Sequence, residues 1–168
     1  MKSKKFLIVF TVFLVMLSCS KKSEPIEVSR ADFHDVLDQV IDVMVHDIFS
    51  PPVASRVFAY PNIAAYEIVA ENNETYKSLS GQIEHLGKIP SADESKDVNY
   101  RLAALMAHLN LSKRLIFSEQ MLQPYQDSLY TIWQEKNAKQ FEDSKEYASE
   151  VVDFIAEWMY KDNYIQTR

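Results

Sequence analysis

The chain has 168 residues and a net charge of −6, with one cysteine, two glycines and 47% hydrophobic residues. This length suits one domain, and the apolar fraction is too high for a disordered chain. A single cysteine excludes a disulfide framework and a thiolate zinc cluster, and two glycines exclude a glycine-rich phosphate loop. The composition therefore predicts a small, helical domain.

The first residues have the pattern of a secretory signal peptide. Lysines precede an apolar run, Phe6 to Leu17, that is too short to span a bilayer. Met-Leu-Ser-Cys at 16–19 resembles a bacterial lipobox, in which Cys19 becomes the diacylated first residue of the mature protein. We therefore predict a signal peptide over 1–18, lipidation of Cys19 and a tether over 19–28. An ordinary cleaved signal with a cysteine nearby is the alternative.

The charge of the mature chain restricts its partners. Removal of residues 1–18 takes away three lysines and no acidic residue, which leaves a charge of −9. Such a body is repelled by phosphate backbones, so no nucleic-acid partner is predicted. The predicted partner is the membrane of the bacterial cell envelope, on its periplasmic face or at the outer membrane, reached through the lipid anchor.

Two amphipathic helices are predicted next. Apolar residues recur every three or four positions, first at Phe33, Leu37, Val40, Met44 and Ile48, then at Val53, Val57, Tyr60, Ala64 and Ile68. Residues 29–32 resemble a capping box. Ser-Pro-Pro at 50–52 ends the first helix, and Pro52 can open the second. At Pro61, inside the second pattern, we expect a kink or a short break.

Residues 72–91 are predicted to form a long loop, because both glycines and several asparagines and prolines fall there. A loop of this size is often functional. Residues 91–94 resemble another capping box, which would start a third helix along Val98, Leu102, Leu105 and Leu109. Leu115 to Phe117 would continue that helix.

Two further apolar stripes complete the pattern. They lie at Leu122, Tyr125, Leu129 and Ile132, and at Tyr147, Val151, Phe154 and Trp158. We expect Asp143 to cap the last of these helices. The predicted fold class is all-α, a bundle of about five helices over residues 29–168. Tyr164 and Ile165 need a surface to pack against, which suggests that the chain ends in mid-structure.

The histidines offer a weak metal hypothesis. His34 with Asp38, and Asp42 with His46, are pairs one helical turn apart that could share a metal ion. A solvated acidic helix face accounts for the same spacing and is favoured, because no third histidine is near in sequence. We therefore predict no metal site and no cofactor-binding residue.

Other catalytic signatures are equally weak. No G-x-S-x-G elbow occurs for a serine nucleophile. Four cations are candidate phosphate ligands by charge alone, although salt bridges are the favoured interpretation: Arg56, Arg101, Lys113 and Arg114. Five aromatic residues are expected in the core rather than on a stacking platform: Tyr60, Tyr66, Tyr100, Trp133 and Trp158.

Residues 44–79 are the most distinctive stretch. Their segments SPPVASR at 50–56 and AYPNIAAYE at 59–67 resemble the N-terminal helical region of bacterial vanadium-dependent haloperoxidase-like proteins. These belong to the type-2 phosphatidic acid phosphatase superfamily. Gly81-Gln82, residues 115–119 and the ending are similar too, so that the resemblance covers roughly residues 30–168.

The resemblance implies an all-helical fold and an oxyanion pocket. In the superfamily this pocket hydrolyses phosphate esters, or oxidises halides with peroxide when it holds vanadate. It is built from three motifs in the C-terminal half: K-x-x-x-x-x-x-R-P, P-S-G-H and S-R-x-x-x-x-x-H-x-x-x-D. Lys and Arg neutralise the oxyanion, while the histidines serve as acid or base and as nucleophile or vanadium ligand.

None of these motifs occurs in the sequence. Arg-Pro and P-S-G-H are absent, and the histidine position of the third motif is Asn62 after Ser55-Arg56 and Val36 after Ser29-Arg30. No catalytic residue of the family can therefore be assigned here. Vanadate is expected only in a complete family member.

Two hypotheses follow. The first is a lipid-anchored N-terminal portion of a haloperoxidase/phosphatase-like protein, inactive alone. An exposed apolar face would then associate with a C-terminal catalytic chain or with a second copy. The alternative is a self-sufficient helical lipoprotein that binds a partner or a small ligand.

Overall fold

A computed structural model describes residues 23–167, so the predicted signal peptide and Cys19 lie outside the described residues. The prediction of an all-α fold is confirmed, because residues 23–167 contain no strand beyond an isolated bridge between Ser80 and Ile83. The elements are α2 (Arg30–His46), α3 (Pro51–Glu71), α4 (Tyr100–Leu115), the 3-10 turn η1 (Glu119–Met121), α5 (Gln123–Lys136), α6 (Ala138–Lys161) and α7 (Tyr164–Thr167).

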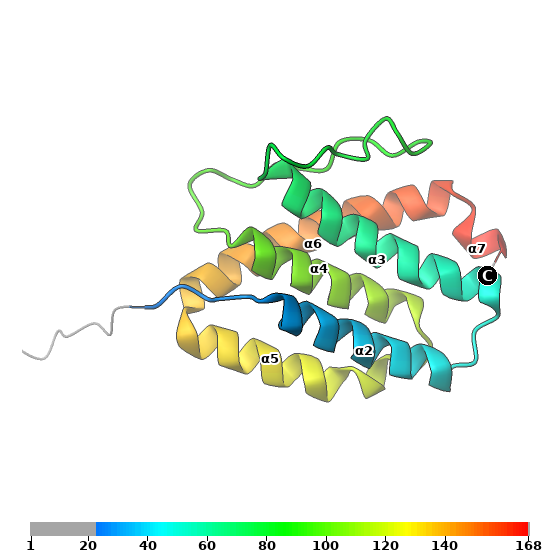
Figure 1. Cartoon of the computed structure of the whole chain (residues 1–168), viewed down its shortest axis with the longest axis horizontal. Coiled ribbons are helices and arrows are strands. Elements are labelled where there is room, and N and C mark those ends of the chain that lie inside the picture. Colours follow the sequence, from blue (N-terminus) through cyan, green and yellow to red (C-terminus); the bar gives the residue numbers. More distant parts are fainter. Residues whose placement is uncertain (1–22, 168) are drawn as a thin grey trace, which may run out of the picture.

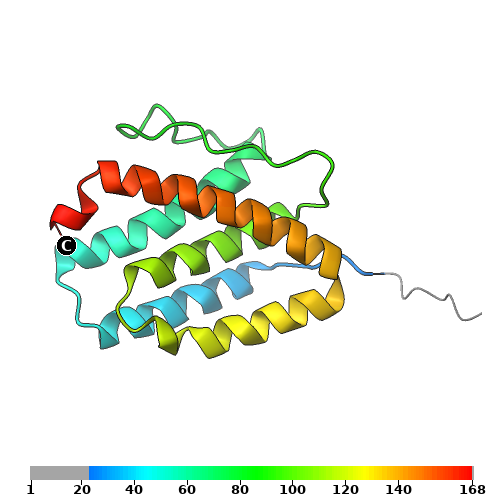
Figure 2. The ribbon, with the colours of Figure 1, turned by 180° about the vertical axis from the view of Figure 1, so that it is seen from behind.

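Helix α4 is the centre of the bundle. It packs against α2, α3 and α6, while α5 packs against α6 and η1 (Figure 1). The reverse view shows α6 running across the back of α3 and α4 (Figure 2). All residues of α4 from Leu102 to Leu109 are buried, which is the pattern of a helix enclosed on every side.

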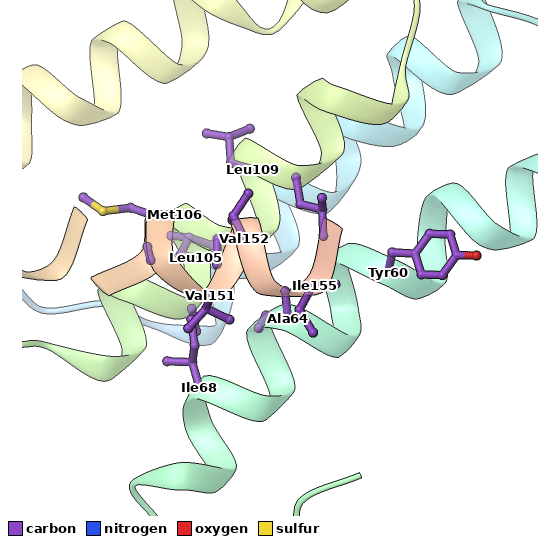
Figure 3. Close-up of a cluster of buried hydrophobic side chains, with 14 of the residues drawn as sticks. Tyr60, Ala64, Ile68, Leu105, Met106, Leu109, Val151, Val152 and Ile155 are labelled. Carbon is purple, nitrogen blue, oxygen red and sulfur yellow. The ribbon is translucent and has the colours of Figure 1, made fainter. Parts of the chain in front are cut away.

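Aliphatic side chains from three helices form the main core. Figure 3 shows Ala64 and Ile68 of α3 beside Val151 and Ile155 of α6, with Leu105 and Leu109 of α4 and Val152 of α6 in the same cluster. Each buried Leu, Ile or Val side chain contributes roughly 1.5–3 kcal/mol to stability. The apolar repeats that predicted these helices therefore identified the faces that pack together.

The helix caps match the prediction at one place and differ at two. At the start of α2, Ser29 and Asp32 form the expected reciprocal capping box. Helix α4 begins nine residues after Ser91 and is capped by Asn99, and α6 is capped by Asn137 rather than by Asp143. Both asparagine side chains accept a hydrogen bond from the third amide of their helix.

The two residues wrongly predicted as caps have tertiary partners instead. The Ser91 hydroxyl donates to the Glu71 carboxylate at 2.7 Å. The Asp143 carboxylate lies within α6 and accepts a hydrogen bond from the Asp97 amide at 2.8 Å. A cap needs an oxygen directed at the free amides of the first turn, and the local sequence alone did not show which oxygen would be so directed.

The connector between α3 and α4 runs from residue 72 to residue 99, longer than the predicted loop. It passes along one edge of the bundle, beside α3 and α6 (Figures 1 and 2). Two residues of the connector itself, Leu86 and Ile89, are buried. The Trp158 indole and the Tyr147 hydroxyl, both on α6, donate to its carbonyls at Glu84 and Pro90. Tertiary contacts thus order a segment with no helix of its own.

Helix α3 continues through Pro61 without the expected break. Proline removes one backbone donor, which would otherwise bond to the carbonyl of Val57. Pro61 itself is buried, and the next residue, Asn62, donates from its side chain to the carbonyl of Phe58 at 2.8 Å. Pro61 is thus accommodated within a continuous helix.

Three apolar residues lie elsewhere than predicted. Ile48 follows the end of α2 and is 87% exposed, and Ile132 is exposed while its neighbour Trp133 is buried. Phe117 lies beyond α4, which ends at Leu115.

Tyr164, expected to need a packing surface, is buried and meets Tyr60 edge-on. No helix between residues 23 and 167 combines the length and apolar character needed to cross a bilayer.

Candidate functional site

A surface pocket lies where the start of α2 meets α3, α4 and the beginning of the connector. Its volume is about 560 Å³. This lies within the usual range for sites that take a small molecule, roughly 300–1,000 Å³. We call it the arginine pocket, because Arg30 and Arg101 both line it.

One wall of the arginine pocket is apolar. It is formed by Phe33 of α2, Ala65 and Val69 of α3, and Ala104 of α4. Tyr66 and Tyr76 also line the pocket and meet each other edge-on, with ring centroids 6.3 Å apart. Tyr66 was expected in the core but is only half-buried and takes part in this lining. The wall therefore offers aromatic and aliphatic surface to a bound group.

The polar lining is cationic and amidic. Arg30 and Arg101 supply the charges, and Ser29, Asn62 and Asn73 supply neutral polar groups. No aspartate or glutamate is among the lining residues, although the chain holds 24 acidic and 18 basic residues. The pocket is thus positively charged on an acidic protein.

The arginines stand on backbone that is held in place. The Ile26 amide donates to the Gln140 side chain of α6 at 2.8 Å, and its carbonyl accepts from the Asn99 side chain at 2.6 Å. Ser29 is then fixed by its capping box with Asp32. Arg30 is the first residue of α2, and Arg101 lies in the first turn of α4.

A second depression of about 460 Å³ adjoins the arginine pocket and shares Arg101 with it.

The structure separates the four cations that the sequence offered as phosphate ligands. Arg56 forms a salt bridge with Asp162, and Arg114 forms one with Asp153, each with a nitrogen–oxygen distance of 2.7 Å. Lys113 donates to the side chains of Gln123 and Gln126. The favoured interpretation, that these cations form salt bridges, is therefore confirmed for Arg56 and Arg114. Arg101 differs, because it lines a pocket without a carboxylate.

Arg30 was missed by the sequence reasoning. It lies 71 positions before Arg101, and nothing in the local pattern pairs the two residues. Its position beside a capping box indicated a helix start and gave no functional signal. Only the packing of α2 against α4 brings both arginines to one pocket.

The four histidines do not meet. His34 and His46 are exposed on α2, and His85 is exposed in the connector. His108 is buried in α4, where its ring meets Phe33 edge-on at 5.2 Å. Between residues 23 and 167 no three His, Cys, Asp or Glu side chains are grouped in a way that could hold a metal ion.

His108 has an unusual environment for a titratable group. Both ring nitrogens are buried and lack a hydrogen-bond partner within the described part of the chain. Burial lowers the pKa of His108 to about 4, because the charged imidazolium loses its hydration. The ring is therefore neutral at physiological pH. It lies directly behind Phe33, which is part of the pocket wall.

A second polar cluster joins α3 to the segment between α6 and α7. The Asp162 carboxylate accepts from the Tyr60 hydroxyl at 2.6 Å and from Arg56 at 2.7 Å. Its pKa is lowered by the Tyr60 hydrogen bond and by Arg56, while burial raises the pKa of Tyr60. Because each member of the cluster is bonded to another member, its role is structural: it holds α3 to the segment between α6 and α7.

The lining of the arginine pocket does not fit a vanadate centre of the haloperoxidase type. Such a centre needs a histidine ligand and a lysine beside the oxyanion, and neither residue type lines the pocket. The one buried histidine is separated from the pocket by Phe33. No redox step is therefore assigned to these residues.

Among the comparisons with known proteins, a match to a solved structure is informative. No protein-family model matches the chain, and no curated protein matches it significantly. A solved structure described as the first bacterial vanadium-dependent iodoperoxidase matches with 56% sequence identity and a TM-score of 0.85. The match covers 88% of this chain but only 36% of the iodoperoxidase chain. In sequence and in fold, the chain is therefore similar to about one third of a bacterial vanadium iodoperoxidase.

Proposed function

We propose that this chain is the lipid-anchored N-terminal portion of a vanadium haloperoxidase/acid phosphatase-like protein. In this role its helices support a catalytic portion and do not supply the oxyanion site. Alone, the 168-residue chain does not oxidise halides or hydrolyse phosphate esters. The single observation that carries the proposal is the match to the iodoperoxidase, at 56% identity over 88% of this chain but 36% of that chain.

One property of the sequence supports this division of roles. The sequence contains neither Arg-Pro nor P-S-G-H, two elements of the superfamily's oxyanion pocket. In the proposed role, the groups that neutralise an oxyanion and transfer protons are supplied by another segment.

An apolar surface suits contact with such a segment. Val45, Ile48 and Phe117 are exposed where the turn after α2 meets the end of α4, and we call them the apolar end patch. The Asp47 carboxylate binds the Phe117 amide at 2.7 Å and holds the two chain segments together. Ile48 has a φ of +54°, which lies in the left-handed region of backbone conformation. This conformation costs a β-branched residue roughly 1–2 kcal/mol relative to the right-handed one. Covering this patch would remove apolar area from water.

Iodide oxidation tests the catalytic part of the proposal. Purified chain is mixed with hydrogen peroxide, iodide and orthovanadate, and triiodide formation is followed against a vanadate blank. We expect no turnover above the blank, while the bacterial iodoperoxidase serves as the positive control. Vanadate-dependent turnover by the 168-residue chain would overturn the proposal.

Complementation tests the partner. The portion of the iodoperoxidase outside the matched 36% is co-expressed with this chain, and both purification of a complex and triiodide formation are measured. We expect a complex that gains vanadate-dependent turnover. A stable complex without turnover would argue for contact without a shared active site, against the proposed role.

Metabolic labelling tests the anchor. In bacteria given tritiated palmitate, we expect the label to reach this chain and the chain to sediment with membranes. Cys19→Ser should lose both the label and the sedimentation, whereas Ser20→Ala should keep them. An unlabelled chain that is cleaved normally would favour an ordinary signal peptide.

The alternative is a self-sufficient binding module, and one observation favours it. The main core is closed within residues 23–167, with α4 enclosed on its sides by α2, α3 and α6. A thermal melt with simultaneous light scattering separates the two functions. A cooperative melt without aggregation favours the module, whereas association through the apolar end patch favours the N-terminal portion.

A further inference from the structure

We propose that the arginine pocket binds an organic anion with a flat apolar body, such as an aryl or alkenyl carboxylate, sulfonate or phosphate. This proposal concerns the chain's own surface and does not depend on the haloperoxidase role. It rests on the positive charge of the lining, on the position of the apolar wall, and on the finding that no described side chain already binds the guanidinium groups of the pocket.

The charge argument starts from the arginines of the described chain. Of these four residues, Arg56 and Arg114 are engaged by aspartates. The guanidinium groups of Arg30 and Arg101 have no ion pair or hydrogen bond with any residue between 23 and 167. Guanidinium groups present several donors in one plane, which suits a carboxylate, sulfonate or phosphate.

The local field favours an anion further. No carboxylate lines the pocket, so nothing in its lining offsets the two positive charges. Each arginine also lies in the first turn of its helix, where the partial charge of the backbone is positive. At the start of α4 this partial charge adds to the potential that the two side chains create, whereas at the start of α2 the Asp32 carboxylate, bonded to Ser29, offsets it.

The wall argument sets the shape of the ligand. Phe33, Val69 and Ala104 form an apolar surface within the same pocket as the arginines. Tyr66 and Tyr76 add two aromatic rings, and the Tyr66 hydroxyl is already used in donating to the Lys77 carbonyl at 2.8 Å. A bare inorganic anion would leave this surface uncovered. An anion with an apolar body would cover it while its charged group meets the arginines.

Arginine footprinting tests the proposal on the full chain. The purified full chain is treated with phenylglyoxal, and modification of each arginine is timed by peptide mass spectrometry. The ligand used is naphthalene-2-sulfonate. At about five times its dissociation constant, we expect the rates at Arg30 and Arg101 to fall about sixfold, because only the empty pocket reacts. The rate at Arg114 should not change.

Two control compounds separate the parts of the recognition. Sodium sulfate carries the charge without the ring, and 2-naphthol carries the ring without the sulfonate. Each should protect Arg30 and Arg101 much less than naphthalene-2-sulfonate at equal concentration. Equal protection by sulfate would overturn the apolar part of the proposal, and equal protection by 2-naphthol would overturn the anionic part.

Matched variants complete the test. Arg101→Gln should largely abolish the protection of Arg30, whereas Arg114→Gln on the same helix should leave it intact. Both arginines are exposed, so neither change removes core packing, and circular dichroism confirms that each variant is folded. Unchanged protection of Arg30 in Arg101→Gln, or equal protection of all arginines in the parent chain, would overturn the site.

Discussion

Glu67 and Leu79 are joined by a partly buried hydrogen bond, in which the Glu67 carboxylate accepts from the Leu79 amide at 2.7 Å. The other carboxylate oxygen accepts from the Ser78 hydroxyl at 2.6 Å, and Glu67 is only 1% exposed. This side chain therefore fastens the start of the long connector to α3. Tyr66, the neighbour of Glu67, lines the arginine pocket and bonds to the same part of the connector.

Replacing Glu67 should loosen the connector. Glu67→Ala leaves the Leu79 amide and the Ser78 hydroxyl without an acceptor, so the free energy of unfolding should fall by about 2–4 kcal/mol. Glu67→Gln should lose less, because its amide oxygen can still accept from Leu79. Urea unfolding measures both, and hydrogen exchange at Leu79 should quicken in Glu67→Ala. The exposed Glu74→Ala is the control, and equal stability of Glu67→Ala and Glu74→Ala would contradict the anchoring role.

His108 should make the stability depend on pH. With a folded pKa of about 4 and an ordinary value of 6.5, the unfolded chain binds a proton that the folded chain excludes. The free energy of unfolding should therefore fall as the pH is lowered from 6.5 to 4, by up to about 3 kcal/mol. Urea unfolding across this pH window measures the loss.

A variant separates the contribution of His108 to this pH dependence from that of carboxylates, whose protonation begins in the same pH window. His108→Leu should flatten the difference between the two ends of the window, and at neutral pH it should be more stable by about 1 kcal/mol, because two unpartnered buried nitrogens are removed. The exposed His34→Gln should keep the parent profile. A His108→Leu profile that runs parallel to the parent would show that His108 is not the source.

The cap of α4 can be located by substitution. Asn99→Ala removes the acceptor for the Leu102 amide and the donor to the Ile26 carbonyl. We expect a loss of about 1–2 kcal/mol in the free energy of unfolding. Ser91→Ala removes a hydroxyl bonded to Glu71 near the surface and should cost less than about 0.5 kcal/mol. The reverse order of these two losses would restore Ser91 as the cap.

The hydrogen bond from Tyr60 to Asp162 should make a measurable contribution to the free energy of unfolding. Tyr60→Phe keeps the ring contacts with Trp158 and Tyr164 but loses the 2.6 Å bond to the carboxylate. We expect a loss of about 1 kcal/mol at neutral pH. Because the pKa of Asp162 is lowered in the folded state, the stability it adds is present above its ordinary pKa and is lost as the pH falls through the folded value.

The pH behaviour and a matched variant check this assignment. The cost of Tyr60→Phe should shrink once Asp162 is protonated, as measured by urea unfolding in acid. Tyr66→Phe, which loses an exposed bond to the Lys77 carbonyl, should cost less at neutral pH and show no such decline. A cost for Tyr60→Phe that is independent of pH would indicate packing as its cause.

Much of the fold follows from local patterns. The repeats at Val57, Ala64 and Ile68 predicted the buried face of α3, and the Ser29–Asp32 box predicted the start of α2. Periodicity and capping act over a few residues, so they can be read without the rest of the protein. The cap at Asn99 could not be identified in this way, since its side chain also bonds to Ile26, 73 positions away.

The candidate site shows the same division. The sequence by itself determined that the chain is all-helical, that it contains none of the three motifs of the haloperoxidase pocket, and which arginines it contains. Only the tertiary structure decided that Arg56 and Arg114 meet aspartates while Arg30 and Arg101 line one pocket. The physical reason is that helix formation depends on neighbours along the chain, whereas the pairing of charges depends on which helix faces pack together.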